Sequence, residues 1–438
     1  MIEKIEKFLK KQIDEYEIYY KEHSSLNADI QNNKINFISD GVSHGLSIRV
    51  FTNKRLGFAY TSDLNQYQKC IETAIKIAKM NKIDKDFKGF VKKANYRHIK
   101  NYNEKVSQIT PHFINKFTTR LVKNISDINK NIKIAGGIFS KTITNLNIRN
   151  SNGINYVDKT ADNSFMASLV LKNKDHFENI GIAKSSRLPL SQDIGKCEAK
   201  RLLNLLNKKS LKNGQMQLAL HPDALGDLFN QSYVFSINAA NVQSKKSLWH
   251  NKIENKVFDK NLTIIDDGIS ENLLCSRSFD DEGTPSQKFK VIENGILKNI
   301  LYDNQHAQKD NTKSTSNAQR DVQSLPSILP NNIIIKSGAS KDIINEIDKG
   351  IYIRNLLGVH TMNEATGDFS LGITEGFYIE NGEIKHPIKG TMIAGNFFKI
   401  MNNVEALTKE KKHSLSVSGG CYFPEILFKK IKIIGNSA

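Results

Sequence analysis

Apolar and polar positions alternate differently in the two halves of the chain. In the N-terminal half, the pattern predicts an amphipathic helix over residues 2–13, strands from about 17 to 60, and a helix over about 64–80. A polar Asn53-Lys54 turn between two apolar runs predicts a hairpin within the strand region. The residues expected to face inward from the second helix are Cys70, Ile71, Ala74, Ile75 and Ala78.

A second helix-and-strand unit is expected after a polar linker at about 82–108. Pro111 is placed at the first turn of a helix that reaches about Asp127, because that turn tolerates a missing N–H. Long alternating strands follow, broken by a turn at Asn150-Ser-Asn-Gly, and a helix over about 192–208 closes the region.

From about residue 215 onward, short apolar runs are separated by many glycine turns, which predicts a mainly β structure. The tripeptide Glu-Asn-Gly occurs at 293–295 and at 380–382, each time between apolar runs, and this is a strong hairpin signal. We therefore predict an α+β fold with an N-terminal α/β domain followed by a β-rich C-terminal domain. The expected boundaries are 1–212, with sub-units at about 1–82 and 109–212, and 213–438.

Composition narrows the class of protein. The 438 residues, 39% of them hydrophobic, can form a buried core in each domain. No apolar run reaches the eighteen residues typical of a membrane helix, and acidic residues interrupt the start of the chain, so we expect a cytoplasmic protein without membrane association. The net charge of +18 comes from scattered lysines rather than a basic stripe, so a nucleic-acid partner is not expected. The four cysteines lack CxxC spacing, which argues against disulfides and zinc knuckles.

The stretch LALHPDALGDLF, which begins at Leu218, is a candidate metal site. His221 ends an apolar run, and Asp227 lies on the helix predicted to follow. Two ligands on one helix face are four residues apart, as in His-Glu-x-x-His, whereas His221 and Asp227 are six apart. His221-Pro222 is also typical of a strand-to-helix turn with proline at the first helical position. The structural interpretation is favoured over a ligand role.

Three other groups could carry chemistry. Cys421 follows two glycines and could be a thiolate ligand, although a lone cysteine on a strand is more often a small buried apolar residue. Asp280, Asp281 and Glu282 precede a Gly-Thr-Pro turn, where paired carboxylates could serve acid–base catalysis or bind calcium. Adjacent carboxylates point in different directions, so a polar turn is favoured, and the same holds for Glu364 and Asp368.

The order of five sequence blocks resembles the TldD/PmbA family, also called modulators of DNA gyrase. The likeness extends over nearly the whole chain. The blocks are GLSIRVFTNKRLGFAYTSDL, FDDEGTPSQKFKVIENGILKNILYD, TSNAQR, ATGDFSLGITEGFYIENGEIKHPIKGTMIAGN and SGGCYFPEI. The resemblance implies two domains, dimerisation around an enclosed cavity, and a heterodimeric zinc-dependent peptidase that acts on unfolded or leader peptides.

The same resemblance implies that this chain lacks the complete zinc site. TldD-type chains carry His-Glu-x-x-x-His and a cysteine near the C-terminus. In this sequence the first histidine corresponds to His221, the glutamate to Pro222, the second histidine to Gly226, and the cysteine to Cys421. Without the glutamate there is no general base for a zinc-bound water. The chain therefore resembles the PmbA/TldE-type partner, with no catalytic residues and no bound cofactor, and His221, Asp227 and Cys421 remain only vestigial ligand candidates.

Three functional hypotheses remain. The first is a subunit that pairs with a zinc-containing TldD-like chain, or with itself, and helps to hold an extended peptide along a sheet edge. The second is an autonomous zinc hydrolase that uses His221, Asp227 and Cys421. The third is a non-enzymatic regulator that binds DNA or a DNA enzyme. The block TSNAQR also departs from the family's commoner Thr-Gly-Asn-Gly-Arg-Arg, which leaves the role of that loop open.

The segment from Ala365 to Asn396 is predicted to be a meander of the C-terminal sheet, and the family resemblance implies that such strands surround the enclosed cavity, or chamber. Strict alternation of faces places Ile373 and Phe377 inward, where they become candidates for lining a substrate cavity. Glu383 and Lys385 flank a hairpin turn and are expected to be solvated.

Overall fold

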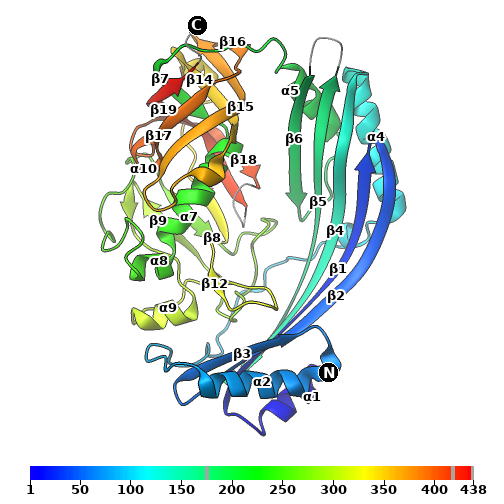
Figure 1. Ribbon diagram of the computed structural model, residues 1–438, viewed down its shortest axis with the longest axis vertical. Coiled ribbons are helices and arrows are strands. Elements are labelled where there is room, and N and C mark those ends of the chain that lie inside the picture. Colours follow the sequence, from blue (N-terminus) through cyan, green and yellow to red (C-terminus); the bar gives the residue numbers. More distant parts are fainter. Residues whose placement is uncertain (173–176, 416–419, 436–438) are drawn as a thin grey trace.

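The computed structural model describes residues 1–172, 177–415 and 420–435. Within these ranges the strands form a six-stranded, an eleven-stranded and a two-stranded sheet. The six-stranded sheet is antiparallel, in the order β3-β2-β1-β4-β5-β6, and Figure 1 shows it as a long, curved wall beside the C-terminal half. Its strands are β1 (Glu15–Gln31), β2 (Lys34–Thr52), β3 (Arg55–Thr61), β4 (Ile132–Asn150), β5 (Asn155–Lys172) and β6 (Phe177–Ser186).

Helices cover one face of this sheet in two groups. Even-numbered residues of β1 such as Ile18 and Ala28 are buried beneath them, because successive side chains of a strand point to opposite faces. Gly57 lets β3 approach its helix closely, since a Cβ there would lie 2.0 Å from the backbone oxygen of Ala74. At one end are α1 (Ile2–Leu9) and α2 (Tyr67–Met80), and at the other are α3 (Glu104–Ser107), α4 (Pro111–Ile128) and α5 (Ile194–Leu203).

The predicted elements of this half are present, with shifts at their ends. Asn53 and Lys54 both have positive φ, 49° and 59°, as a tight two-residue hairpin turn requires. The first helix ends at Leu9, but Ile13 still packs against the same apolar cluster from the turn that follows. The helix predicted over 192–208 spans only Ile194–Leu203, because the chain turns after it and Asn207 adopts a left-handed φ of 62°.

The C-terminal half is built around the eleven-stranded sheet. Both Glu-Asn-Gly tripeptides form the predicted hairpin turns, one joining β9 to β10 and the other joining β15 to β16. The strands of the large sheet are β7 (Gly214–Leu220), β8 (Ile264–Asp267), β9 (Lys288–Glu293), β10 (Ile296–Leu297), β13 (Asn332–Ile335), β14 (Lys349–Leu357), β15 (Asp368–Glu380), β16 (Glu383–Pro387), β17 (Met392–Asn396), β18 (Val404–Ser414) and β19 (Cys421–Ile434). The two-stranded sheet pairs β11 (Ala318–Gln319) with β12 (Ser327–Ile328).

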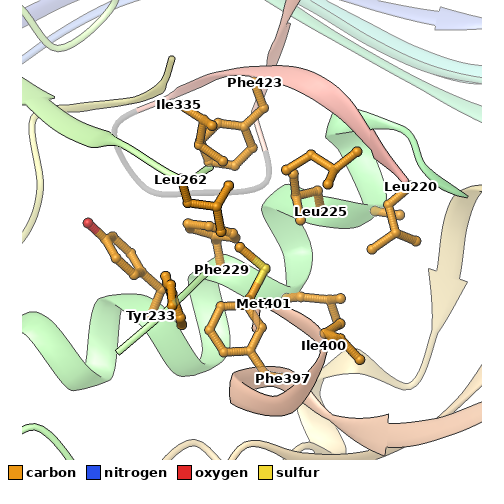
Figure 2. Packing of buried hydrophobic residues seen from close by; sticks show 14 of the residues in the cluster. Leu220, Leu225, Phe229, Tyr233, Leu262, Ile335, Phe397, Ile400, Met401 and Phe423 are labelled. Carbon is orange, nitrogen blue, oxygen red and sulfur yellow. The ribbon is translucent and has the colours of Figure 1, made fainter. Parts of the chain in front are cut away.

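A helical segment from Pro222 to Ile237 packs into the core of this half. It comprises α6 (Pro222–Leu228), a π-helical turn (Phe229–Tyr233) and α7 (Val234–Ile237). Figure 2 shows Leu225 and Phe229 pointing into the core, and the Phe229 ring centroid lies 4.8 Å from that of Phe423 and 5.4 Å from that of Phe397. The remaining helices are α8 (Ala239–Gln243), α9 (Asn304–Lys309) and α10 (Phe397–Ile400), with 3₁₀ turns at Leu64–Gln66, Ile344–Glu346 and Val359–Thr361.

The arrangement confirms the predicted α+β fold class. The small sheet ends at Ser186 and the large sheet begins at Gly214, so the proposed domain boundary at residue 212 falls in the connection between the two sheets. Both N-terminal sub-units contribute to one sheet, since β1 pairs with β4 from Glu17 to Gln31. Among the described residues, no helix is both long enough and apolar enough to cross a membrane.

Candidate functional site

The junction of β7 and α6 has the form that the sequence predicts for a strand-to-helix turn. His221 is the N-cap of α6 with extended backbone angles, and Pro222 is the first helical residue. Nδ1 of His221 accepts a hydrogen bond of 3.1 Å from the backbone N–H of Asp223, and it also lies 3.2 Å from the Asp223 carboxylate. Burial lowers the pKa of His221, and the nearby carboxylate offsets this only in part, so the neutral ring serves as a cap at pH 7.

The two faces of α6 have different roles. Leu225 and Phe229 are four residues apart and point into the core, whereas Asp223 and Asp227, also four apart, line a cavity on the opposite side. Burial raises the pKa of Asp223, but His221, Arg354 and Lys184 outweigh it and hold that pKa below its ordinary value. The helix therefore presents carboxylates to the cavity.

This cavity has a volume of about 510 Å³ and lies between the two halves of the chain. One wall is the strand β6, which in the described part of the molecule pairs only with β5 and is therefore an edge strand. The opposite wall comes from α6, from the ends of β14 and β18, and from the middle of β15. The lining residues are Asn179, Ile180, Gly181, Ile182, Ala183, Lys184, Arg201, Asp223, Asp227, Arg354, Asn355, Leu356, Leu357, Thr374, Glu375, Ser414 and Leu415.

Ion pairs at the cavity link the helix α5 to the C-terminal sheet. The Arg201 guanidinium donates two hydrogen bonds of 2.7 Å to the carboxylate of Glu375, one from Nε and one from Nη2. Glu375 also accepts a 2.9 Å hydrogen bond from Asn355, and Arg354 contacts Asp223 at 3.2 Å. Three cations and three carboxylates line the cavity, so its charges are balanced.

Irregular pairing of β14 with β15 directs two residues toward the cavity. The register passes from Ile353↔Gly376 to Asn355↔Glu375 and then to Leu356↔Ile373, which leaves Arg354 and Thr374 unpaired. Both unpaired residues line the cavity. Bulges of this kind re-aim side chains beside functional sites.

The same irregularity separates Ile373 from Phe377, which strict alternation would place on one face. Ile373 is buried in the main apolar cluster of the C-terminal half. Phe377 is half-buried and packs against the cluster beneath α4 and α5 and against a smaller C-terminal cluster. Thr374 and Glu375, which lie between them, line the cavity, whereas Ile373 and Phe377 do not. Their contribution to a substrate chamber stays a prediction.

Cys421 begins β19, in register with Ser414 of β18, and is fully buried. Its thiol lies 3.5 Å from the backbone oxygen of Ser414. Pro222 and Gly226, at the positions of the motif's glutamate and second histidine, offer no side-chain ligand. Within residues 1–172, 177–415 and 420–435, no three His, Cys, Asp or Glu side chains are grouped so that they could hold a metal ion. These residues do not supply the donor set of the zinc site.

The two carboxylate clusters singled out from the sequence, Asp280-Asp281-Glu282 and Glu364 with Asp368, differ in burial. Asp280, Asp281 and Glu282 are all buried, at the contact between the two halves. Asp368, by contrast, is exposed and accepts hydrogen bonds from Thr366 and Asn396 in a surface turn. The polar-turn interpretation therefore suits Asp368, whereas in the buried cluster Asp280 holds the turn and Glu282 pairs with Arg49 of β2.

Two family models match the sequence of this chain. The family model described as "PmbA/TldA metallopeptidase C-terminal domain" matches residues 213–435. A second model, "PmbA/TldA metallopeptidase domain 1", matches residues 16–78. The chain belongs to the PmbA/TldD family. The predicted resemblance is thereby confirmed.

Relatives of known name or structure support this membership. An uncharacterized protein of Methanocaldococcus jannaschii is 29% identical and covers 98% of both chains. A zinc metalloprotease TldD homolog of Saccharolobus solfataricus is 24% identical, over 91% of this chain and 92% of the relative. The crystal structure of TldE from Thermococcus kodakarensis has a TM-score of 0.93 and 26% identity, covering 99% of this chain and 100% of that chain.

Sequence reasoning missed Arg201, Arg354 and Glu375, the charged residues of the cavity. Arg201 lies on the predicted helix over 192–208 and Glu375 on a predicted strand, so both would be taken for solvated positions. One signal was available, because Glu375 interrupts the apolar run GITEGFY at a place where a strand turned toward a core would have another apolar residue.

Proposed function

We propose that this chain is the PmbA/TldE-like, non-catalytic subunit of a cytoplasmic metallopeptidase complex that degrades unfolded or leader peptides. It dimerises with a TldD-like chain, which supplies the zinc, or with a second copy of itself. The observation that carries the proposal is the cavity along the free edge of β6, in a chain whose zinc motif is replaced at Pro222 and Gly226.

The edge of β6 offers main-chain N–H and C=O groups to an extended peptide. A peptide that adds as a further strand is held by its own backbone, so binding depends little on its sequence. The balanced charges that line the cavity, such as Arg201, Arg354, Asp223 and Glu375, neither repel nor select a strongly charged peptide. An unfolded polypeptide of mixed composition fits such a site.

The test fills the cavity without disturbing the fold. A Cβ at Gly181, in β6, would meet no atom within 4 Å, so Gly181→Phe adds bulk to the cavity at no cost in packing. Gly136→Phe is the matched control, since Gly136 is equally open on β4 of the same sheet but does not line the cavity. Both variants are made in the complex with the TldD-like chain, and their binding of an unfolded peptide is titrated.

We expect Gly181→Phe to weaken peptide binding about tenfold or more, corresponding to about 1.4 kcal/mol, while Gly136→Phe binds like the parent. Equal binding by both variants would move the peptide site elsewhere. Zinc per purified chain is measured alongside, with an expected value well below one. Stoichiometric zinc with chelator-sensitive peptidase activity in the isolated chain would replace the proposal with an autonomous hydrolase that uses His221, Asp227 and Cys421.

A further inference from the structure

The face of β5 and β6 that points away from α4 and α5 lies open beside the cavity. Phe165 and Leu169 of β5 and Ile182 of β6 are buried in the apolar cluster beneath these helices. Successive side chains of a strand point to opposite faces, so the even-numbered residues 166–170 and the odd-numbered residues 179–183 belong to the other face. Residues 179–183 also line the cavity. A peptide that adds to the edge of β6 would extend this same face.

Gly181 lies in the middle of β6 without a reason in the packing of the chain itself. A Cβ at this position would meet no atom within 4 Å, the backbone has no left-handed φ, and β6 pairs with β5 without a bulge. A glycine weakens a strand, and where no bulge or bend requires it, it often marks the close approach of a ligand. The cross-strand neighbour of Gly181 on β5, Ser168, is also small. The two residues therefore form a low strip at the edge of the sheet.

Larger apolar side chains flank this strip along β5. Met166 is 50% exposed, and its cross-strand neighbour Ile138 on β4 is 42% exposed. Val170, on the other side of the strip, is half-buried. Single exposed apolar residues are common on protein surfaces, but here two of them are paired across neighbouring strands beside a glycine. Same-face residues of a strand are about 7 Å apart, so the strip between Met166 and Val170 has room for one large side chain. We call this strip the trough.

A peptide strand added to β6 would direct every second side chain over this face. Strands lie about 4.8 Å apart, so a large side chain that lies across Gly181 or Ala183 reaches the long, flexible side chain of Met166 on β5. Aromatic residues pair in this way with cross-strand glycines. Gly136, the next residue of the same row, is three strands from the peptide, about 14 Å, which no side chain spans. The charges around the cavity are balanced, so apolar contact is left to separate one peptide from another.

We propose that the trough gives the site a preference for peptides that carry large apolar side chains at alternate positions. The preference rests on the proposed binding of a peptide to the edge of β6. Backbone hydrogen bonds would hold any extended peptide there, and apolar residues at positions i and i+2 would add contacts with Met166 over Gly181 and Ala183. This alternation is typical of half-buried strands, which are covered in folded proteins and become accessible when a protein unfolds. The substrate class is therefore the strand-forming segments of unfolded proteins.

The experiment compares the binding of fluorescent peptides to the complex with the TldD-like chain. Two peptides of serine and threonine have the same length and composition, and each contains two phenylalanines, at positions i and i+2 in one peptide and at adjacent positions in the other. A third peptide without phenylalanine reports binding by the backbone alone. We expect the alternate peptide to bind about tenfold more tightly than the adjacent one, corresponding to about 1.4 kcal/mol, because adjacent side chains point to opposite faces.

The variant Met166→Ser removes the apolar wall without touching the core, since Met166 is half-exposed. It should reduce the preference for the alternate peptide to less than about twofold and leave the affinity for the third peptide unchanged. Val157→Ser is the matched control, because Val157 is an exposed apolar residue of the same strand that does not line the cavity, and it should keep the tenfold preference.

The outcomes separate this proposal from the proposed function. Equal binding of the alternate and adjacent peptides by the parent complex, or a preference that persists in Met166→Ser, would overturn the trough and leave the proposed function intact. Failure of all three peptides to bind would overturn both. Light scattering is measured on the same samples, and loss of assembly in Met166→Ser would overturn the trough by assigning Met166 to the dimer interface.

Discussion

Two of the charged contacts between the N-terminal and C-terminal halves have opposite character. At the first, the contact of Arg49 on β2 with Glu282, which we call the joint, the two side chains are only 4% and 1% exposed. At the cavity, Arg201 and Glu375 are also paired, but beside them Arg354 and Asp223 keep 22% and 28% exposure and line an open volume. The first contact is closed by protein on all sides, whereas the second leaves charged groups within reach of a ligand.

This difference separates structural charge from functional charge. Charges removed from water lose hydration, so they persist only while each has its partner, and deleting one partner strands the other. Charges beside water lose less of their hydration, and they can exchange a protein partner for a ligand. Substitutions in the joint should therefore act on the folding of the whole chain, and substitutions in the cavity should act more on peptide binding.

The largest effect is expected for Arg49→Ala. This change leaves both Glu17 and Glu282 buried without their shared cation, and we expect a loss of about 3–5 kcal/mol in the free energy of unfolding. Urea unfolding followed by circular dichroism measures it. A loss below about 1 kcal/mol would mean that the joint is hydrated and no different from the cavity.

A smaller effect on stability, with a clear effect on binding, is expected for Arg201→Ala. Glu375 retains the hydrogen bond from Asn355, and Arg354 lies 3.9 Å away, so the carboxylate is not left alone. We expect a loss of about 2 kcal/mol, the size of a hydrogen bond to a charged group. Peptide binding to the complex, measured by fluorescence anisotropy, should weaken at the same time. Stability lost without any change in binding would make Arg201 a second structural joint.

Much of the fold follows from local sequence signals, because turn chemistry and periodicity act over a few residues. The Asn53-Lys54 and Glu-Asn-Gly turns, the helix that begins at Pro111 and the N-cap role of His221-Pro222 were all predictable in this way. Two of the charged pairs were not, because each joins residues more than 170 positions apart in the chain, Arg201 with Glu375 and Glu282 with Arg49. Alternation also fails at Arg354 and Thr374, where irregular pairing changes which side chains face the cavity.

The smallest effect is expected where an apolar side chain, rather than a charge, connects the halves. Phe377 is half-buried and packs against apolar clusters from both halves, so Phe377→Ala should cost about 1–2 kcal/mol, less than the 3–5 kcal/mol typical of a fully buried phenylalanine. Lys385→Ala is the control, because Lys385 pairs with exposed Glu383 on β16 and should change stability by less than about 0.5 kcal/mol. Urea unfolding compares the two, and the assembled complex is then assayed on an unfolded peptide. Lower peptide degradation by Phe377→Ala than by Lys385→Ala would support its predicted place beside the chamber, and equal degradation would make Phe377 ordinary scaffold between the halves.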